Sequence, residues 1–364
     1  MIQPRDTLKN IIPYKPGKSI QQVQSELGLS QVIKLGSNEN PWGSPVSTEE
    51  MADIIASVAM YPDIRSGPLL GKLADRLGVS ESHLMLGNGS DEILTMIGLA
   101  YLNPGDRVLT AKETFSEYGF VAHLMNAQLK EIALKDYTFD LDAMGVVINA
   151  PSERPVKMVF IANPNNPTGT IVKSSDFRRF MNAIPSDVLV VMDEAYAEFV
   201  EDPDYPNSIS LLTEYPNLIV TRTFSKLYGL AGFRIGYAIA SPEIIAVLYK
   251  VRQPFNINSL ALAAATVALD KTEFVARTLA NNREERDRLT RVFLGHRLPV
   301  IPTHANFVCV PFGKDAALIV RKLLERGIIV RHLASFGMPD HVRITIGTPE
   351  QNTLLIAALA DSLT

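Results

Sequence analysis

The feature that most constrains the fold of this chain is a series of short apolar runs rich in valine and isoleucine. They are Arg107–Thr110, Met158–Ile161, Val188–Met192, Leu218–Thr221 and Ile235–Ile239. Such runs are typical of strands that are buried on both faces, and helical patterns lie between them. Strands that alternate with helices predict an α/β fold, with a mostly parallel sheet that helices cover on both faces.

The C-terminal third of the chain has a different pattern, which predicts a smaller α+β unit. Strands are expected at Asn306–Pro311, Ile328–Arg331 and Val342–Ile346, and helices at Asp315–Glu325 and Glu350–Leu363. A long helical stretch from Ser259 to Leu294 leads into this unit, and we expect residues 1–40 to pack against it. The predicted large domain is therefore 41–257, and the predicted small domain combines 1–40 with 258–364.

Charge and cysteine content narrow the classes of function. The 364 residues include 35 Lys and Arg against 39 Asp and Glu, a formal net charge of −4, which argues against a nucleic-acid partner. The single cysteine, Cys309, cannot form a cysteine-rich metal site, so no metal is predicted. Without a signal-peptide core or a long apolar stretch, we expect a cytoplasmic protein that has no membrane partner.

A glycine-rich turn, Gly87-Asn88-Gly89-Ser90-Asp91-Glu92, opens a helical pattern after an apolar run. Free N–H groups at a helix start bind anions, so the turn favours a phosphate, with a simple capped turn as the alternative. Glu92 stands where a dinucleotide-binding fingerprint has its third glycine. This departure argues against a nicotinamide-dependent dehydrogenase.

Polar side chains follow two of the predicted strands. The segment Asn163-Pro164-Asn165-Asn166-Pro167-Thr168-Gly169 forces successive turns. It would hold the Asn166 amide against a ligand, or serve only as a structural loop. Asp193 directly follows an apolar strand, where a buried carboxylate is costly unless a cation meets it. The cation expected to pair with Asp193 is either a charged group of a ligand or a neighbouring Arg or Lys.

The most informative segment runs from Thr223 to Gly236. Here a strand ends in Ser225-Lys226, and Arg234 follows after a Gly-Leu-Ala-Gly turn. A lysine after a buried strand loses its proton readily and can attack a carbonyl. A serine and an arginine nearby suit a phosphate group.

Together these motifs resemble those of the class I and II, fold-type I, pyridoxal-phosphate (PLP) aminotransferases, from Tyr14 to Arg343 and in the family's order. The resemblance implies a large domain with a mostly parallel sheet and a smaller α+β domain. It also implies that Lys226 bonds covalently to PLP and then moves a proton. Asp193 would pair with the pyridine nitrogen, Asn166 and Tyr196 would contact the ring oxygen, and Phe115 would stack on the ring.

The resemblance also implies which residues bind the cofactor phosphate and which bind the substrate. The cofactor phosphate would be bound by Ser90, Asp91, Ser225 and Arg234, and by Tyr61 of a second subunit, so a homodimer with a shared active site is expected. Substrate contacts would come from Tyr14, Arg331 and Arg343. For Asn40, a substrate contact and a pure turn function are both open.

The resemblance implies the conversion of L-histidinol phosphate and 2-oxoglutarate to imidazole-acetol phosphate and L-glutamate, a step of histidine biosynthesis. On the same fold, the alternatives are an aromatic amino-acid aminotransferase and a threonine-phosphate decarboxylase. A non-catalytic protein of this fold, such as the ligand-binding domain of a regulator, is a further alternative.

Overall fold

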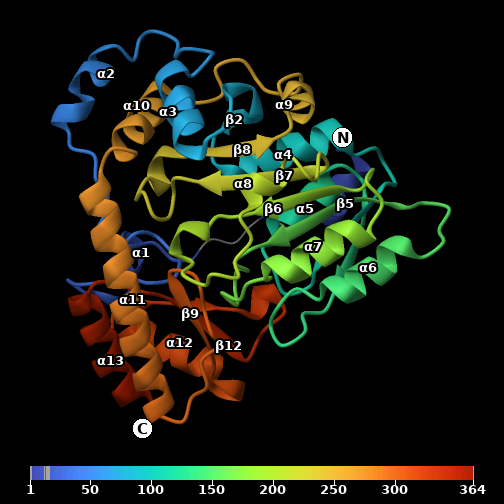
Figure 1. Cartoon of the computed structure of the whole chain (residues 1–364). Coiled ribbons are helices and arrows are strands. Elements are labelled where there is room, and N and C mark those ends of the chain that lie inside the picture. The colour runs from blue at the N-terminus through green and yellow to red at the C-terminus, as the bar shows by residue number, and fades with distance from the viewer. Residues whose placement is uncertain (1, 12, 14–16, 364) are drawn as a thin grey trace.

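The computed structural model describes residues 2–11, 13 and 17–363, and a mixed sheet forms the centre of its larger unit (Figure 1). The strands lie in the order β2-β8-β7-β6-β5-β3-β4. Their bounds are Leu84–Gly87 (β2), Arg107–Ala111 (β3), Gln128–Ile132 (β4), Val156–Ala162 (β5), Leu189–Asp193 (β6), Leu218–Thr223 (β7) and Gly236–Ala240 (β8). Strand β8 is antiparallel to β2 and β7, and the other neighbouring pairs are parallel. The predicted α/β class is confirmed.

Each predicted apolar run of the large unit lies in this sheet, because strands buried on both faces need continuous apolar side chains. Two strands of this sheet were not predicted. Strand β2 is wholly buried but short, and β4 lies at the sheet edge with mostly exposed side chains, so it has no apolar run.

Helices flank the sheet and build much of the second unit (Figure 1). They are α1 (Ile20–Leu27), α2 (Ala52–Ala56), α3 (Gly67–Leu77), α4 (Ser90–Tyr101), α5 (Glu117–Leu124), α6 (Leu141–Asn149), α7 (Ser174–Ala183), α8 (Ser208–Leu211), α9 (Pro242–Leu248), α10 (Ser259–Ala268), α11 (Thr272–Gly295), α12 (Ala316–Glu325) and α13 (Pro349–Leu363). The predicted stretch 259–294 is thus two helices, since the backbone leaves the helical conformation at Lys271. None of the described helices is long and apolar enough to cross a bilayer.

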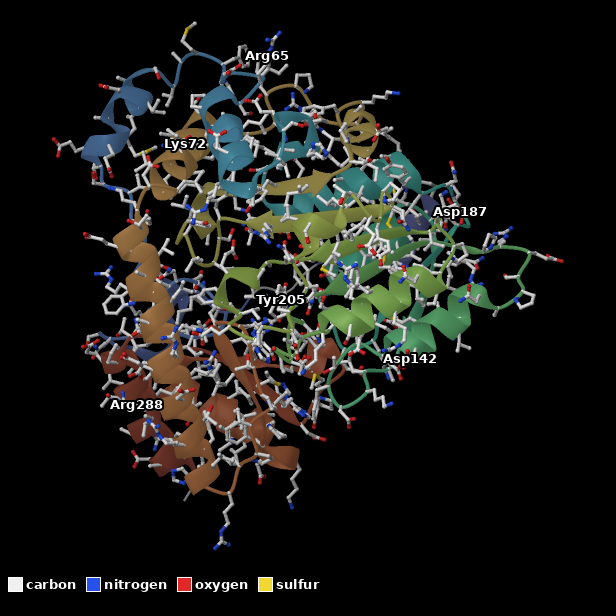
Figure 2. All side chains as sticks on the ribbon, in the orientation of Figure 1. Arg65, Lys72, Asp142, Asp187, Tyr205 and Arg288 are labelled. Carbon is white, nitrogen blue, oxygen red and sulfur yellow. The ribbon has the colours of Figure 1, made fainter. Side chains whose placement is uncertain are left out.

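The second unit contains an antiparallel sheet in the order β11-β12-β9 and a separate parallel pair, β1-β10. The bounds are Ile33–Lys34 (β1), Phe307–Pro311 (β9), Ile328–Ile329 (β10), Arg331–His332 (β11) and His341–Thr345 (β12). The predicted strand Ile328–Arg331 is therefore divided between two sheets. Arg288, labelled in Figure 2, joins α11 to α13 by donating to Thr353 Oγ1 at 2.8 Å.

The N-terminal residues contact both units. Strand β1 pairs with β10, and the N–H of Thr345 donates to the carbonyl of Leu35 at 2.8 Å, as expected for packing against the C-terminal unit. In contrast, the short 3-10 helix Asp6–Asn10 lies against α5 of the larger unit. The exact domain bounds, at residues 40 and 257, stay a prediction.

Candidate active site

A cavity lies where β5, β6 and β7 end at their carboxyl edges, facing the second unit. Because parallel strands end at the same edge, residues distant in sequence meet there. The predicted site residues that line the cavity are Ser90, Asp91, Phe115, Asn166, Asp193, Tyr196, Ser225, Lys226, Arg234, Arg331 and Arg343.

Asp193 ends β6 with a buried carboxylate. Its Oδ2 accepts a hydrogen bond from the Tyr118 hydroxyl at 2.8 Å, and its Oδ1 accepts one from the N–H of Ala195 at 3.2 Å. Burial raises the pKa of Asp193 to about 6, and the bond from Tyr118 opposes this rise. No lysine or arginine in the described part of the chain pairs with Asp193, so its carboxylate is available to a cation in the cavity.

Lys226 and Tyr196 lie together in the cavity. The Lys226 Nζ donates to the carbonyl oxygen of Ser37 at 3.3 Å and lies 5.6 Å from the centroid of the Tyr196 ring. The Tyr196 hydroxyl accepts a hydrogen bond from Asn38 Nδ2 at 2.9 Å. An amine and a phenol thus line the same cavity as the carboxylate of Asp193.

An anion site lies at the start of α4. Gly89 precedes the helix at φ 83°, and a Cβ there would lie 2.7 Å from Nη2 of Arg234. That guanidinium donates to Asp91 Oδ2 at 3.0 Å. The carboxylate of Asp91 is therefore bonded to Arg234. The backbone N–H of Asp91 belongs to the first turn of α4, where free N–H groups can bind an anion. Ser225 lines the same cavity.

Two arginines lie side by side on the opposite wall. Arg331 of β11 and Arg343 of β12 are register partners on neighbouring strands. The buried Arg343 donates to Asn166 Oδ1 and, at 2.8 Å, to the carbonyl of Gly36. Paired guanidinium groups suit a phosphate or a carboxylate, which they bind through several hydrogen bonds.

Three predicted residues are not placed in this cavity. The buried Asn40 donates to the carbonyl of Leu227 at 2.8 Å and accepts from the N–H of Trp42 at 3.0 Å, which favours a turn function. Tyr61 is 81% exposed and stacks on Phe255 with ring centroids 4.6 Å apart. Tyr14 lies outside the described residues.

Sequence reasoning missed other cavity residues. Tyr118, Gly36, Ser37, Asn38 and Phe336 line the cavity, yet none had been singled out. For Asn38 a signal existed, because it belongs to the same Asn-Glu-Asn-Pro segment as Asn40. Only the structure distinguishes which of the two asparagines faces the cavity.

The donor set fits the predicted cofactor. Asp193 needs a cation, Phe115 offers an aromatic face, and Arg234 with the α4 start offers an anion site. PLP carries a ring nitrogen, an aromatic face and a phosphate, and Lys226 lies within the same cavity to bond to its aldehyde.

Comparisons with known proteins point to one family. Residues 30–359 match the family described as aminotransferase class I and II. The chain is 46% identical to the histidinol-phosphate aminotransferase of Brevibacillus brevis, over 100% of this chain and 99% of that one. It is 43% identical to that of Geobacillus thermodenitrificans, over 100% and 98%. The crystal structure of histidinol-phosphate aminotransferase from Sinorhizobium meliloti in complex with pyridoxal-5'-phosphate superimposes with a TM-score of 0.91, at 27% identity over 100% and 98% of the two chains.

Proposed function

The chain belongs to the class I and II aminotransferase family, and from this premise we propose that it transfers the amino group of L-histidinol phosphate to 2-oxoglutarate with PLP as its cofactor. The family membership agrees with the resemblance that the motifs indicated and removes the dehydrogenase alternative. The observation that carries the choice of substrate is the similarity to histidinol-phosphate aminotransferases over the whole chain, at 43–46% identity. The products are imidazole-acetol phosphate and L-glutamate, which places the reaction in histidine biosynthesis.

Several cavity residues have separate roles in binding the cofactor ring. Asp193 would keep a proton on the pyridine nitrogen, Phe115 would stack on the ring, and Asn166 and Tyr196 would contact the ring oxygen. When bound, PLP supplies an electron sink for the carbon that carries the amino group. Buried Asp193 suits this role because the cation of the ring offsets the cost of its own charge.

Lys226 is the catalytic acid and base. Its amine would hold the cofactor through the aldehyde carbon and, once free, would move a proton to and from the substrate α-carbon. A positioned proton-transfer group of this kind typically contributes ~10²–10⁴-fold in rate. Its neighbours, the Ser37 carbonyl and the Tyr196 ring, hold the amine inside the cavity.

Two sets of polar and cationic groups on different walls of the cavity would bind the different anions of the reaction. Arg234, Ser225 and the α4 start with Ser90 and Asp91 bind the cofactor phosphate. On the opposite wall, Arg331 and Arg343 would bind the phosphate of histidinol phosphate. The contact of Tyr14 with that phosphate stays a prediction from the sequence. Arg343 also serves the carboxylates of glutamate and 2-oxoglutarate in the other half-reaction, since a guanidinium accepts both kinds of anion.

A second copy of the chain completes the site in this proposal. Tyr61 is strongly exposed beside other exposed apolar side chains, namely Val58, Met60, Ile64 and Phe255. Contiguous apolar side chains of this kind mark an interaction surface. In the homodimer Tyr61 would reach the cofactor phosphate of the partner subunit. The cytoplasmic location expected from the sequence stays a prediction.

The proposal is tested with a panel of amino donors, each assayed with 2-oxoglutarate. We expect the highest kcat/KM with L-histidinol phosphate, and phenylalanine or tyrosine to be at least ~10-fold poorer, about 1.4 kcal/mol of transition-state binding. Lys226→Ala is the control and should lose activity with every donor. Equal or better use of phenylalanine would favour the aromatic alternative, and carbon dioxide release from threonine phosphate without a keto acid would favour the decarboxylase.

A further inference from the structure

Three successive residues, Gly36, Ser37 and Asn38, each contact a different residue of the proposed site. The carbonyl of Gly36 accepts from Arg343, and the carbonyl of Ser37 accepts from Lys226 Nζ. The side chain of Asn38 donates to the Tyr196 hydroxyl. Of the three, Asn38 is the one that acts through its side chain, so its contribution can be tested by substitution.

The hydrogen bonds around Asn38 fix the orientation of its amide. The Asn38 N–H donates to Thr345 Oγ1 at 2.9 Å, so the Thr345 hydroxyl is left to donate its own proton. That proton goes to Asn38 Oδ1, at 3.1 Å. The amide oxygen is therefore committed to Thr345, and the NH₂ group faces Tyr196.

The segment is also held firmly in place. Asn38 is 1% exposed, and its carbonyl accepts a hydrogen bond from Asn306 Nδ2 at 3.1 Å. Its φ of 56° lies in the left-handed region, which asparagine adopts more readily than most residues do. A buried amide whose oxygen and nitrogen are both hydrogen-bonded does not rotate freely, because an unpaired polar group would cost free energy.

A hydroxyl that accepts from Asn38 has its own proton to donate elsewhere. For Tyr196 the remaining direction is the cavity, where Lys226 lies. We propose that Asn38 is a positioning residue, whose amide directs the proton of the Tyr196 hydroxyl toward the oxygen on the cofactor ring. This inference rests on the proposed function, because it needs PLP in the cavity with Tyr196 beside its ring oxygen.

The proposal predicts a spectroscopic effect. A proton donated to the ring oxygen withdraws negative charge that otherwise stabilises the protonated form of the Lys226-bound cofactor. Loss of that donor therefore moves the pH midpoint of the cofactor's visible absorption change upward. In Asn38→Asp, the carboxylate has only acceptors to offer, so Tyr196 must donate to Asp and no longer to the cofactor.

The experiment is a pH titration of that absorption band in the PLP-loaded enzyme. Two variants, Asn38→Asp and Asn38→Gly, are each made in the enzyme with Tyr196 and in the enzyme with Tyr196→Phe. In the Tyr196 background, Asn38→Asp should raise the midpoint by about one pH unit, a tenfold change in the protonation equilibrium. Asn38→Gly, which tolerates the positive φ and carries no charge, should raise it less. In the Tyr196→Phe background both shifts should fall to less than half, since no phenol proton remains to be directed.

The outcomes separate this inference from the proposed function. Equal shifts in both backgrounds would show a direct charge effect and overturn the role of Asn38, while the function would stand. No visible band would overturn both, whereas no shift with Tyr196→Phe alone would overturn this inference and the contact of Tyr196 with the ring oxygen. If the Asn38 variants do not fold, Thr345→Val gives a second test. It removes the donor to Asn38 Oδ1 and should also move the midpoint upward, whereas an unchanged midpoint would contradict the proposal.

Discussion

Burial of Asp193 lowers the free energy of unfolding of the cofactor-free protein, because its carboxylate ionises without a cationic partner among the described residues. Burial raises its pKa to about 6, from an ordinary value of 3.8. A folded-state pKa above the unfolded value means that the folded protein binds the extra proton between about pH 4 and 6. Stability is therefore lost as pH rises through this window, and the whole cost is present above it.

We predict that Asp193→Asn makes the cofactor-free protein more stable at about pH 8, by ~2–3 kcal/mol, from about two pKa units at 1.36 kcal/mol each. The gain should shrink toward zero at about pH 4, where aspartate in the folded protein is protonated. Urea unfolding of both cofactor-free proteins at the two pH values measures this. The same variant should bind PLP more weakly. A stability gain that is independent of pH would contradict the assignment.

At the residue scale, the sequence predicted groups that belong to a local motif. Lys226, Asp193 and Arg234 could be found because each lies within a recognisable run of neighbours. Tyr118 could not, and the motif that contains Asn38 did not reveal its role, because both roles depend on contacts with Asp193 and Tyr196, 75 and 158 residues away in the chain. Such pairings are created by the fold and leave no local pattern.

At the scale of elements, one buried ion pair joins the carboxyl ends of β6 and β7. Glu194 is fully buried and accepts from Arg222 Nε and Nη2 at 2.9 and 2.8 Å. Since Asp193 precedes Glu194 and Ser225 follows soon after Arg222, the pair fixes the two strand ends that carry site residues. Burial and the neighbouring carboxylate of Glu194 act in opposite directions on the Arg222 pKa, which is raised overall.

We predict that Arg222→Met destabilises the protein by ~3–5 kcal/mol, because it leaves the charge of Glu194 buried without a partner. Adding Glu194→Gln to that variant should restore most of the lost stability. Thermal and urea unfolding of the single and double variants measure both effects. If the double variant is as unstable as the single one, the pair acts through packing rather than charge.

Elements were predicted best where burial leaves a continuous apolar run, as in β5, β6 and β7. The edge strand β4 has mostly exposed side chains and gave no such signal. The break between α10 and α11 also escaped prediction, since Leu269-Asp270-Lys271 contains neither glycine nor proline. Tertiary packing decides these features, and periodicity alone does not report it.

At the scale of the whole molecule, the shared site of the proposed homodimer can be tested by mixing subunits. Lys226→Ala lacks the amine, and Tyr61→Ala lacks the phenol that the partner subunit would receive. In a mixed dimer, one of the two sites has both residues intact. Refolding the two variants together at equal amounts should therefore recover about a quarter of the wild-type activity, from statistical pairing of identical interfaces.

Each variant refolded alone is the control and should stay weakly active or inactive. Recovery that depends on mixing, with dimers seen by sedimentation, would support sharing. An active monomer, or a mixture that shows only the average of its two components, would contradict it.

The short segment that follows strand β1 brings Gly36, Ser37 and Asn38 against Arg343, Lys226 and Tyr196. Under the proposed function, selectivity for the amino donor and reactivity of the cofactor therefore depend on the same short segment, so a change in one is expected to affect the other. A directed-evolution library that varies Arg343 to admit new donors should keep 36–38 constant and be screened for colour as well as turnover. Variants that gain a donor while losing their yellow absorbance would reveal the trade-off directly.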